Sequence, residues 1–240
     1  MRARPGAFLF AGLLLAGAAL LRLDAAYPRT ISFSGTSWSV KTSSGRVGPG
    51  PNYFSDSTSN VWVDGQGRLH LKILKVKNRW TCAEVVSQAS FGHGTYRFFL
   101  DSPVDALDPS AVLGLFTWSD DPAYSNREID VEMSRWGSAA NQNAQYVVQP
   151  YTLASNIHRF QWPAVTPSSH SFAWTSGRVE FQSVDTTTSS VLQSWTCTNA
   201  VPVPGGENAR MNLWLYKGRA PKSGQAVEVV VNRFEFTPAP

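Results

Sequence analysis

Residues 128–133, Glu-Ile-Asp-Val-Glu-Met, alternate strictly between acidic and apolar side chains. Successive side chains of a β-strand point to opposite faces of the sheet. The alternation therefore predicts a strand that buries its three apolar residues and directs Glu128, Asp130 and Glu132 to the other face. A helix would instead place Asp130 on the side opposite the two glutamates.

Three carboxylates on one strand face repel each other, so their clustering calls for a functional explanation. Two carboxyl groups flanking a glycosidic bond are the usual catalytic groups for its hydrolysis, and repulsion helps one of them to keep its proton. The Cα atoms of Glu128 and Glu132 would lie about 13 Å apart on a regular strand. Side chains that lean together would bring the carboxyls to about 5–6 Å, close to the spacing of retaining enzymes. From the residues alone, a solvated acidic strand and a calcium site remain alternatives.

Short apolar segments separated by turn signals continue on both sides of this strand. Residues 64–67, Asp-Gly-Gln-Gly, form a predicted hairpin turn before the alternating residues 68–73. Residues 111–118 are almost continuously apolar, which is typical of a central strand. The pattern predicts one all-β domain over residues 27–240, built from two packed antiparallel sheets.

The first residues have the pattern of a signal peptide. Arg2 and Arg4 precede an uncharged apolar stretch over residues 6–21, and small residues follow it. The stretch is shorter than the roughly 20 residues that span a bilayer. We expect residues 1–26 to be removed and the mature protein to be secreted or periplasmic. An uncleaved membrane anchor is the alternative.

Charge and composition narrow the class of partner. Without residues 1–26, which hold three Arg and one Asp, 18 basic residues face 16 acidic ones, a net charge of +2. We find no basic block with interleaved aromatic residues, so we expect a polysaccharide partner and no nucleic acid. The nine Trp residues could fill the core or line a groove where sugar rings stack. We expect a monomer with no membrane partner after signal cleavage.

Cysteine and histidine usage adds two expectations. Cys82 and Cys197 are predicted to form a disulfide in an exported protein, with two buried thiols as the alternative. The four His residues show no metal-like spacing, so we expect no metal and no cofactor.

The acidic segment, set in such a strand context, resembles the signature of family 16 glycoside hydrolases, which include licheninases, laminarinases and xyloglucan-active enzymes. Four further segments resemble licheninases in order and spacing: Pro-Asn-Tyr-Phe at 51–54, Cys-Ala-Glu at 82–84, Phe-Gly-His-Gly-Thr-Tyr at 91–96 and Met-Asn-Leu-Trp at 211–214. The likeness spans about residues 30–237. It implies a concanavalin-like jelly roll of two curved antiparallel sheets, with the substrate along the concave one.

The resemblance also implies roles for individual residues. Glu128 would be the nucleophile, Asp130 its helper and Glu132 the general acid/base. The matching segments place Asn52, Glu84, Asn212 and Trp214 at sugar-binding positions. Strand parity turns Gln145 and Gln149 to one face, where licheninases have polar contacts to the sugar. Trp118 and Trp136 flank the acidic strand, and either ring could be a platform on which a sugar stacks or could belong to the core.

Several positions depart from the licheninase pattern. Val86, Val147 and Asn126 stand where licheninases carry an arginine, an asparagine and a tryptophan. Asn232 lies close to a position of the family's structural calcium site, so calcium is possible but unsupported. The resemblance implies a retaining endo-β-glucanase, and the Glu-x-Asp-x-Glu spacing weakly favours substrates with β-1,4 or mixed linkage. A non-catalytic lectin-like module and a transglycosylase are the alternatives.

Overall fold

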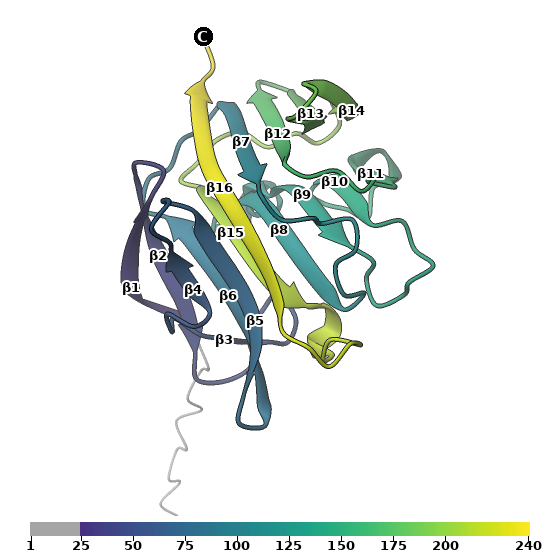
Figure 1. The fold of residues 1–240 in the computed structure, drawn as a ribbon. Helices are drawn as coiled ribbons and strands as arrows, with labels where there is room; N and C mark the ends of the chain where they lie inside the picture. The colour runs from purple at the N-terminus through teal and green to yellow at the C-terminus, as the bar shows by residue number, and fades with distance from the viewer. Residues whose placement is uncertain (1–24) are drawn as a thin grey trace, which may run out of the picture.

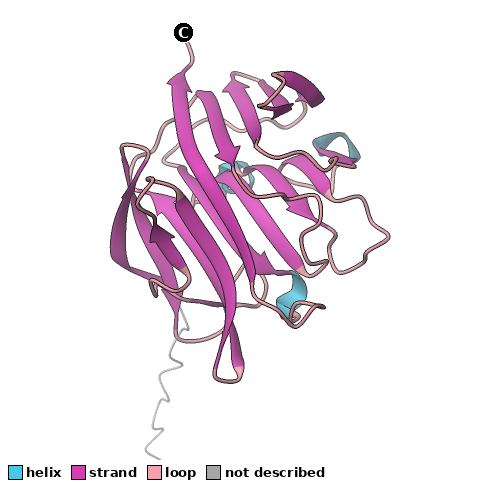
Figure 2. Cartoon of the chain, viewed as in Figure 1, coloured by secondary structure: helices cyan, strands magenta, loops and turns pink. Residues whose placement is uncertain are grey.

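The computed structural model describes residues 25–240. All but the last two residues of the expected signal segment, 1–26, lie outside the described residues. Figure 1 shows the described chain as two facing layers of strands, and Figure 2 shows that helix is confined to short turns. The predicted all-β class with two antiparallel sheets is confirmed. No helix between residues 25 and 240 is long and apolar enough to cross a membrane.

The described residues form sixteen strands and three single-turn 3₁₀ helices. The strands are β1 (Ala25–Phe33), β2 (Thr36–Ser43), β3 (Tyr53–Phe54), β4 (Val61–Val63), β5 (Leu69–Val76), β6 (Arg79–Ser87), β7 (Gly94–Leu100), β8 (Ala111–Trp118), β9 (Ile129–Ser134), β10 (Ala144–Val148), β11 (Ile157–Phe160), β12 (Ser168–Thr175), β13 (Arg178–Asp185), β14 (Ser190–Cys197), β15 (Asn208–Leu215) and β16 (Val227–Pro238). The 3₁₀ helices are η1 (Ala123–Arg127), η2 (Ala154–Asn156) and η3 (Tyr216–Gly218).

Two layers share this set of strands. The cleft sheet runs in the order β11-β10-β9-β8-β15-β6-β2-β1, and the back sheet runs β4-β5-β16-β7-β12-β13-β14. The β5–β6 hairpin joins the two layers. Neighbouring strands pair antiparallel, and the short β3 runs parallel to β6. The acidic strand β9 lies inside the cleft sheet, between β8 and β10.

The core lies between the two sheets. Ile129, Val131 and Met133 of β9 are fully buried there, as the alternation predicted. Aromatic residues of the back sheet pack against them and each other; the Tyr96 and Phe172 rings, for example, stack at 4.8 Å. Complete burial of one large apolar side chain contributes roughly 1.5–3 kcal/mol. The buried side of β9 therefore fixes the register that turns its acidic side outward.

The predicted disulfide is wrong, because Cys82 and Cys197 are both free thiols. Cys82 is in β6, whereas Cys197 ends β14 at the far edge of the back sheet. β14 packs over β11, where the rings of His158 and Trp195 stack at 5.7 Å. Four strands separate β11 from β6, which at about 4.8 Å per strand amounts to more than 20 Å. A disulfide requires Cα atoms within about 7 Å.

Candidate active site

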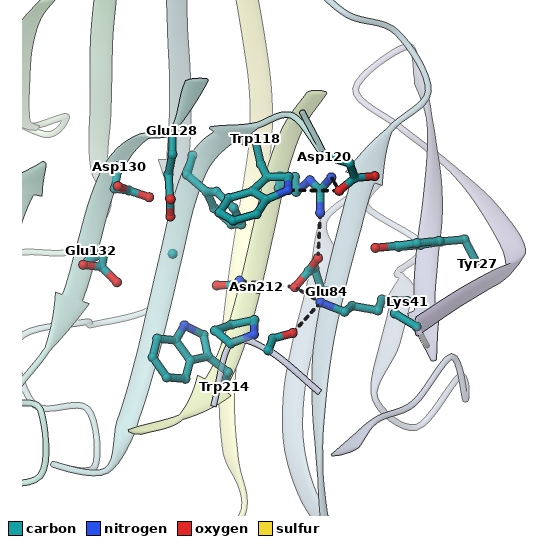
Figure 3. A pocket seen from close by; sticks show the side chains of 16 residues that line it. Tyr27, Lys41, Glu84, Trp118, Asp120, Glu128, Asp130, Glu132, Asn212 and Trp214 are labelled. Atoms are coloured by element: carbon teal, nitrogen blue, oxygen red, sulfur yellow. Dashed lines mark hydrogen bonds and ion pairs between the residues drawn. The ribbon is translucent and has the colours of Figure 1, made fainter. Parts of the chain in front are cut away.

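A cleft of about 360 Å³ opens on the outer face of the cleft sheet. Figure 3 shows Glu128, Asp130 and Glu132 on one side of it and Glu84, Lys41 and Tyr27 on the other. Its remaining lining residues are Ala25, Gly48, Pro49, Gly114, Phe116, Trp118, Asp120, Arg210, Asn212 and Trp214. All three predicted catalytic carboxylates, and Glu84, Trp118, Asn212 and Trp214 among the predicted sugar contacts, therefore meet in one cavity.

Strand register aligns the cleft residues in rows across the sheet. One row contains Gln145, Glu132, Gly114, Asn212 and Glu84, from β10, β9, β8, β15 and β6 in turn. Paired residues of neighbouring strands point to the same face. Four residues of this row, from β9, β8, β15 and β6, therefore line the cleft at one level, whereas Gln145, a predicted sugar contact, lies beside Glu132 and outside the cleft lining.

Gly114 leaves the floor of this row open. A Cβ atom at position 114 would lie 2.6 Å from the Asn212 Oδ1 atom, closer than real contacts allow. The missing side chain creates space between Glu132 on one neighbouring strand and Asn212 on the other. The absence of a side chain at Gly114 therefore makes room for the Asn212 amide, and both residues line the cleft.

The three carboxyl groups are close enough to affect each other's protonation. Burial and the charge of Glu132 raise the pKa of Glu128 to about 8, whereas a hydrogen bond with Asp130 and the charge of Arg210 act to lower it. Burial and the charges of both glutamates raise the pKa of Asp130 well above its usual range. The Asp130 Oδ2 atom is buried and has no hydrogen-bond donor among residues 25–240. The raised pKa favours a protonated Asp130, and a proton on this oxygen would remove its need for a donor.

Glu132 is held by a chain of two further side chains. Burial raises its pKa, and Gln145 and Arg159 counteract this effect. The Gln145 Nε2 atom donates to Glu132 Oε2 at 2.5 Å, and Arg159 donates to Gln145 Oε1 from Nε at 3.0 Å and from Nη2 at 2.6 Å. The Arg159 guanidinium lies 4.2 Å from the centre of the Trp136 ring. Arg159 therefore fixes which end of the Gln145 amide faces Glu132.

The opposite side of the cleft is built around Glu84, which is fully buried. The Lys41 Nζ atom lies 3.0 Å from Glu84 Oε2, and Arg210 Nη1 lies 3.5 Å from Glu84 Oε1. Asn212 donates to Glu84 at 3.4 Å. Two cations and an amide stabilise this carboxylate, so it presents fixed acceptors to the cleft.

Arg210 lies directly across the strand pair from Val86. Val86 is the position at which the licheninase pattern has an arginine, so the neighbouring strand supplies a guanidinium here instead. Arg210 was missed by the sequence reasoning, as were Lys41 and Arg159. The alternation along a strand shows which residues share a face, but it does not show which other strand lies alongside. Because that pairing between distant strands is not visible in one sequence, the sequence did not place these three side chains beside the cleft.

Two tryptophans border the carboxylates. Figure 3 places Trp118 beside Glu128 and Trp214 farther along the cleft. The Trp118 Nε1 atom donates to Asp120 Oδ1 at 3.0 Å, which fixes the ring orientation. Both indoles are only partly buried, so their rings can contact a ligand.

Asn52 and Gln149 lie outside the residues that line the cleft. The Asn52 amide donates to the carbonyl oxygens of Pro49 at 2.8 Å and Leu215 at 2.9 Å, so it ties a cleft loop to the end of β15. Gln149 follows β10; its backbone N–H donates to the Glu128 carbonyl oxygen at 3.0 Å. Its side chain also acts to lower the pKa of Asp130. Asn52 therefore holds the loop beside the cleft, and Gln149 supports the acidic strand.

The residues at the expected calcium position do not form a donor set. The Asn232 Nδ2 atom donates to Asp101 Oδ2 at 2.9 Å, and Arg68 lies 3.6 Å from the same oxygen. Between residues 25 and 240, no group of three or more His, Cys, Asp or Glu side chains is placed to hold a metal ion. We therefore assign no step to calcium.

Solved structures share this fold at low sequence identity. A β-glucanase from Bacillus licheniformis matches with a TM-score of 0.64 and 19% identity, covering 90% of this chain and 98% of that chain. A laminarinase from Flavobacterium sp. UMI-01 matches with a TM-score of 0.60 and 11% identity, covering 83% and 92%. An immunostimulatory antigen and pseudo β-1,3-glucanase of Mycobacterium tuberculosis matches with a TM-score of 0.63 and 19% identity, covering 85% and 91%. No protein-family model and no curated protein matches the sequence. The chain thus has the licheninase- and laminarinase-like fold that the resemblance implied.

Proposed function

We propose that this protein is a secreted, retaining glycoside hydrolase that cleaves β-glucan chains internally. The observation that carries the proposal is the placement of Glu128, Asp130 and Glu132 at alternate positions of one strand, all inside a single cleft. The residues that line the cleft come from β1, β2, β6, β8, β9 and β15, and a cleft that crosses several strands suits binding within a chain. The fold of the similar glucanases supports the same reaction class.

The geometry supports a two-step displacement at the anomeric carbon. In the first step the Glu128 carboxylate attacks that carbon while protonated Glu132 donates its proton to the departing glycosidic oxygen. In the second step the Glu132 carboxylate removes a proton from water, which attacks the same carbon and releases Glu128. Two inversions give net retention of configuration.

The protonation states needed for this sequence follow from coupling among the three acids. The negative charge of Glu132 is one cause of the high Glu128 pKa. When Glu132 takes up a proton, this contribution disappears, and the hydrogen bond from Asp130 and the charge of Arg210 favour an ionised Glu128. Asp130 keeps its own proton because burial and both neighbours raise its pKa. The proposed mechanism requires that the hydrogen bond from Asp130 and the charge of Arg210 outweigh the burial of Glu128, so that Glu128 is ionised for attack while Glu132 is protonated for donation.

The other side of the cleft can bind sugar hydroxyls. The Glu84 Oε1 atom, which lies 3.5 Å from Arg210 Nη1, and the Asn212 Oδ1 atom are buried acceptors that receive no hydrogen bond from the residues that the structure describes. Hydroxyl groups of a glucan would supply these donors. Trp118 and Trp214 offer ring faces beside them, which suits the apolar faces of pyranose rings.

A mechanism-based label tests the proposed nucleophile. Incubation with a 2-fluoroglycoside of a β-glucan oligosaccharide should trap the ester, and mass spectrometry of peptides should locate the added mass on Glu128. Glu128→Ala and Glu132→Ala should each abolish turnover of barley glucan, laminarin or xyloglucan while the circular dichroism spectrum stays unchanged. Labelling of another residue in an active protein would overturn the assignment, and normal rates in both variants would overturn the mechanism.

A lectin-like sugar binder without catalysis is the second candidate, because one structure with this fold is described as a pseudo β-1,3-glucanase. Such a protein would bind glucan yet release no reducing sugar. A transglycosylase would share the labelled intermediate but would transfer the sugar to an added oligosaccharide faster than to water. Release of reducing ends, with and without acceptor sugar, separates the three activities.

A further inference from the structure

Six basic side chains gather at one end of the molecule, outside the candidate active site. We call them the basic end: Arg46, Lys75, Lys77, Arg79, Lys217 and Arg219. They belong to the loop before β3, the tip of the β5–β6 hairpin, and η3 with the residue that follows it; these segments lie toward the bottom of Figure 1. All six are exposed, and none forms an ion pair with an acidic side chain between residues 25 and 240. Residues 44–52, 75–79 and 216–219 contain no acidic residue.

Specific contacts hold the three segments together. The Asn52 amide donates to the Leu215 carbonyl oxygen at 2.9 Å, which joins the first loop to the start of η3. Gly218 packs so tightly on the same loop that a Cβ there would lie 2.4 Å from the Pro51 carbonyl oxygen. Tyr53 pairs with β6 just beyond the hairpin. The positive charges are therefore clustered by tertiary packing and do not depend on one flexible loop.

A pocket of about 220 Å³ lies within the basic end. Its walls include Arg46, Tyr53, Asn78, Arg79 and Trp80. The guanidinium of Arg79 lies 4.0 Å from the centre of the Tyr53 ring, and that of Arg46 lies 5.6 Å from it. Two guanidinium groups beside one ring repel each other, and an anion between them would remove that cost. Guanidinium groups bind carboxylates and sulfates through paired hydrogen bonds.

The pocket adjoins the cleft. One loop contributes Gly48 and Pro49 to the cleft and Pro51 to the pocket. In the same way, β15 contributes Trp214 to the cleft and Leu215 to the pocket. The loop that contains Gly48, Pro49 and Pro51 therefore borders both the cleft and the pocket of the basic end.

We propose that the basic end binds acidic groups, carboxylate or sulfate, on a polysaccharide whose chain occupies the cleft. This rests on the proposed function and narrows its substrate class from neutral to acidic β-glycans. Nucleic acid fits less well, because its phosphates would have to continue into a cleft that contains Glu128, Asp130 and Glu132. A glycan with occasional acidic substituents places neutral rings at those acids and charge at the arginines.

Two glucans with the same backbone test the inference. Neutral barley glucan and its carboxymethylated derivative are titrated calorimetrically into the full-length Glu128→Gln variant, which prevents hydrolysis during the measurement. We expect the acidic glucan to bind about tenfold tighter at low ionic strength, and the advantage to disappear in about 0.5 M salt, where charges beyond a few ångströms are screened. Adding Arg46→Ala and Arg79→Ala should remove the advantage and leave binding of neutral glucan unchanged. The matched control is the double substitution Arg97→Ala and Arg178→Ala, which removes two exposed arginines of the back sheet. This control should keep the tighter binding of the acidic glucan.

The outcomes separate this inference from the proposed function. Equal affinity for both glucans, or an unchanged advantage in the Arg46 and Arg79 variant, overturns the inference. Tighter binding of single-stranded DNA than of carboxymethyl glucan, lost in the same variant, also overturns it. Hydrolysis of both glucans by the unmodified protein is measured separately. Preference for the acidic glucan without any hydrolysis supports the inference and contradicts only the proposed reaction.

Discussion

At the scale of single residues, the cleft depends on side chains that act through others. Glu132 receives one hydrogen bond from Gln145, whose amide orientation is set by Arg159. Asn212 is placed by the absence of a side chain at Gly114. Neither Arg159 nor Gly114 carries a reacting group, yet each determines where a polar atom of the cleft points. Substitutions at these two positions are therefore informative about mechanism.

We predict that Arg159→Met shifts the pH dependence of catalysis. The charge of Arg159 and the amide that it orients both act to lower the Glu132 pKa, so their loss raises that pKa further. Glu132 then keeps its proton to higher pH, and the alkaline limb of the kcat/KM profile shifts to higher pH. We also expect about a tenfold lower kcat because the amide can rotate, equivalent to about 1.4 kcal/mol. Arg159→Lys, which keeps the charge but cannot donate in the same paired geometry, should recover the pH profile more than the rate. An unchanged profile in Arg159→Met would contradict this role.

We predict that Gly114→Ala impairs substrate binding. The added Cβ meets Asn212 Oδ1 at 2.6 Å and narrows the space beside Glu132. The expected result is about a tenfold fall in kcat/KM that appears mainly in KM, measured on barley glucan. Gly65→Ala is the matched control, because nothing lies within 4 Å of a Cβ there and its backbone is compatible with alanine. Equal kinetics of the two variants would contradict an open floor at Gly114.

At the scale of elements, the strands bury a polar network as well as apolar side chains. His170 of β12 is fully buried; its Nδ1 atom lies 2.7 Å from the Ser183 hydroxyl, and its Nε2 atom lies 3.1 Å from the Ser168 hydroxyl. The Tyr146 hydroxyl donates to the same Ser183 at 2.6 Å. This network joins the back sheet to β10, the strand that carries Gln145 on its other face. Burial lowers the pKa of His170 to about 3.

We predict that this histidine makes the fold less stable in acid. An unfolded histidine has a pKa near 6.5, so below about pH 6.5 the unfolded state binds a proton that the folded state excludes. Stability should therefore fall as the pH drops from about 6.5 toward 3, with a loss of about 2 kcal/mol by pH 5 from this group. Urea unfolding at pH 7 and pH 5 measures the difference. The His170→Gln variant has an amide that does not titrate, so it should lose less free energy of unfolding between pH 7 and pH 5 than the unmodified protein. An identical loss in the variant and the unmodified protein would exclude His170 as the cause.

A second element-scale feature precedes the acidic strand. Tyr124, Ser125, Asn126 and Arg127 have φ values from 51° to 60°, so the backbone forms a left-handed turn that non-glycine residues rarely adopt. Arg127 anchors it, because Nε donates to the Val203 carbonyl oxygen at 3.0 Å and Nη1 lies 3.0 Å from Asp121 Oδ2. The Asn126 amide closes the loop by donating to the Ser119 carbonyl oxygen at 2.9 Å. These contacts determine where Glu128 enters the cleft.

At the scale of the whole molecule, the two faces of the cleft sheet have different roles: one face packs in the core and the other lines the cleft. Its inner face contributes β9 residues to the core, whereas its outer face contributes side chains from β1, β2, β6, β8, β9 and β15 to the cleft. The same arrangement keeps the two cysteines far apart and brings the three basic segments together at one end. The residues that line the cleft can therefore vary while the buried residues maintain the fold.

The sequence by itself determined the all-β class, the strand at residues 129–134 and the common face of Glu128, Asp130 and Glu132. These features are local: the two-residue period of a strand fixes which side chains share a face, whatever strand lies alongside. The segments Cys-Ala-Glu and Met-Asn-Leu-Trp also predicted that Glu84, Asn212 and Trp214 belong to the cleft, because they resemble segments with that place in a known fold.

Only the tertiary structure decided which strands lie side by side. It placed Arg210 across from Val86, connected Arg159 through Gln145 to Glu132, placed Asn52 outside the cleft lining and kept Cys82 apart from Cys197. Each of these outcomes depends on contacts between residues distant in sequence. Such contacts follow from the packing of the two sheets as a whole, which the alternation along any one strand does not specify.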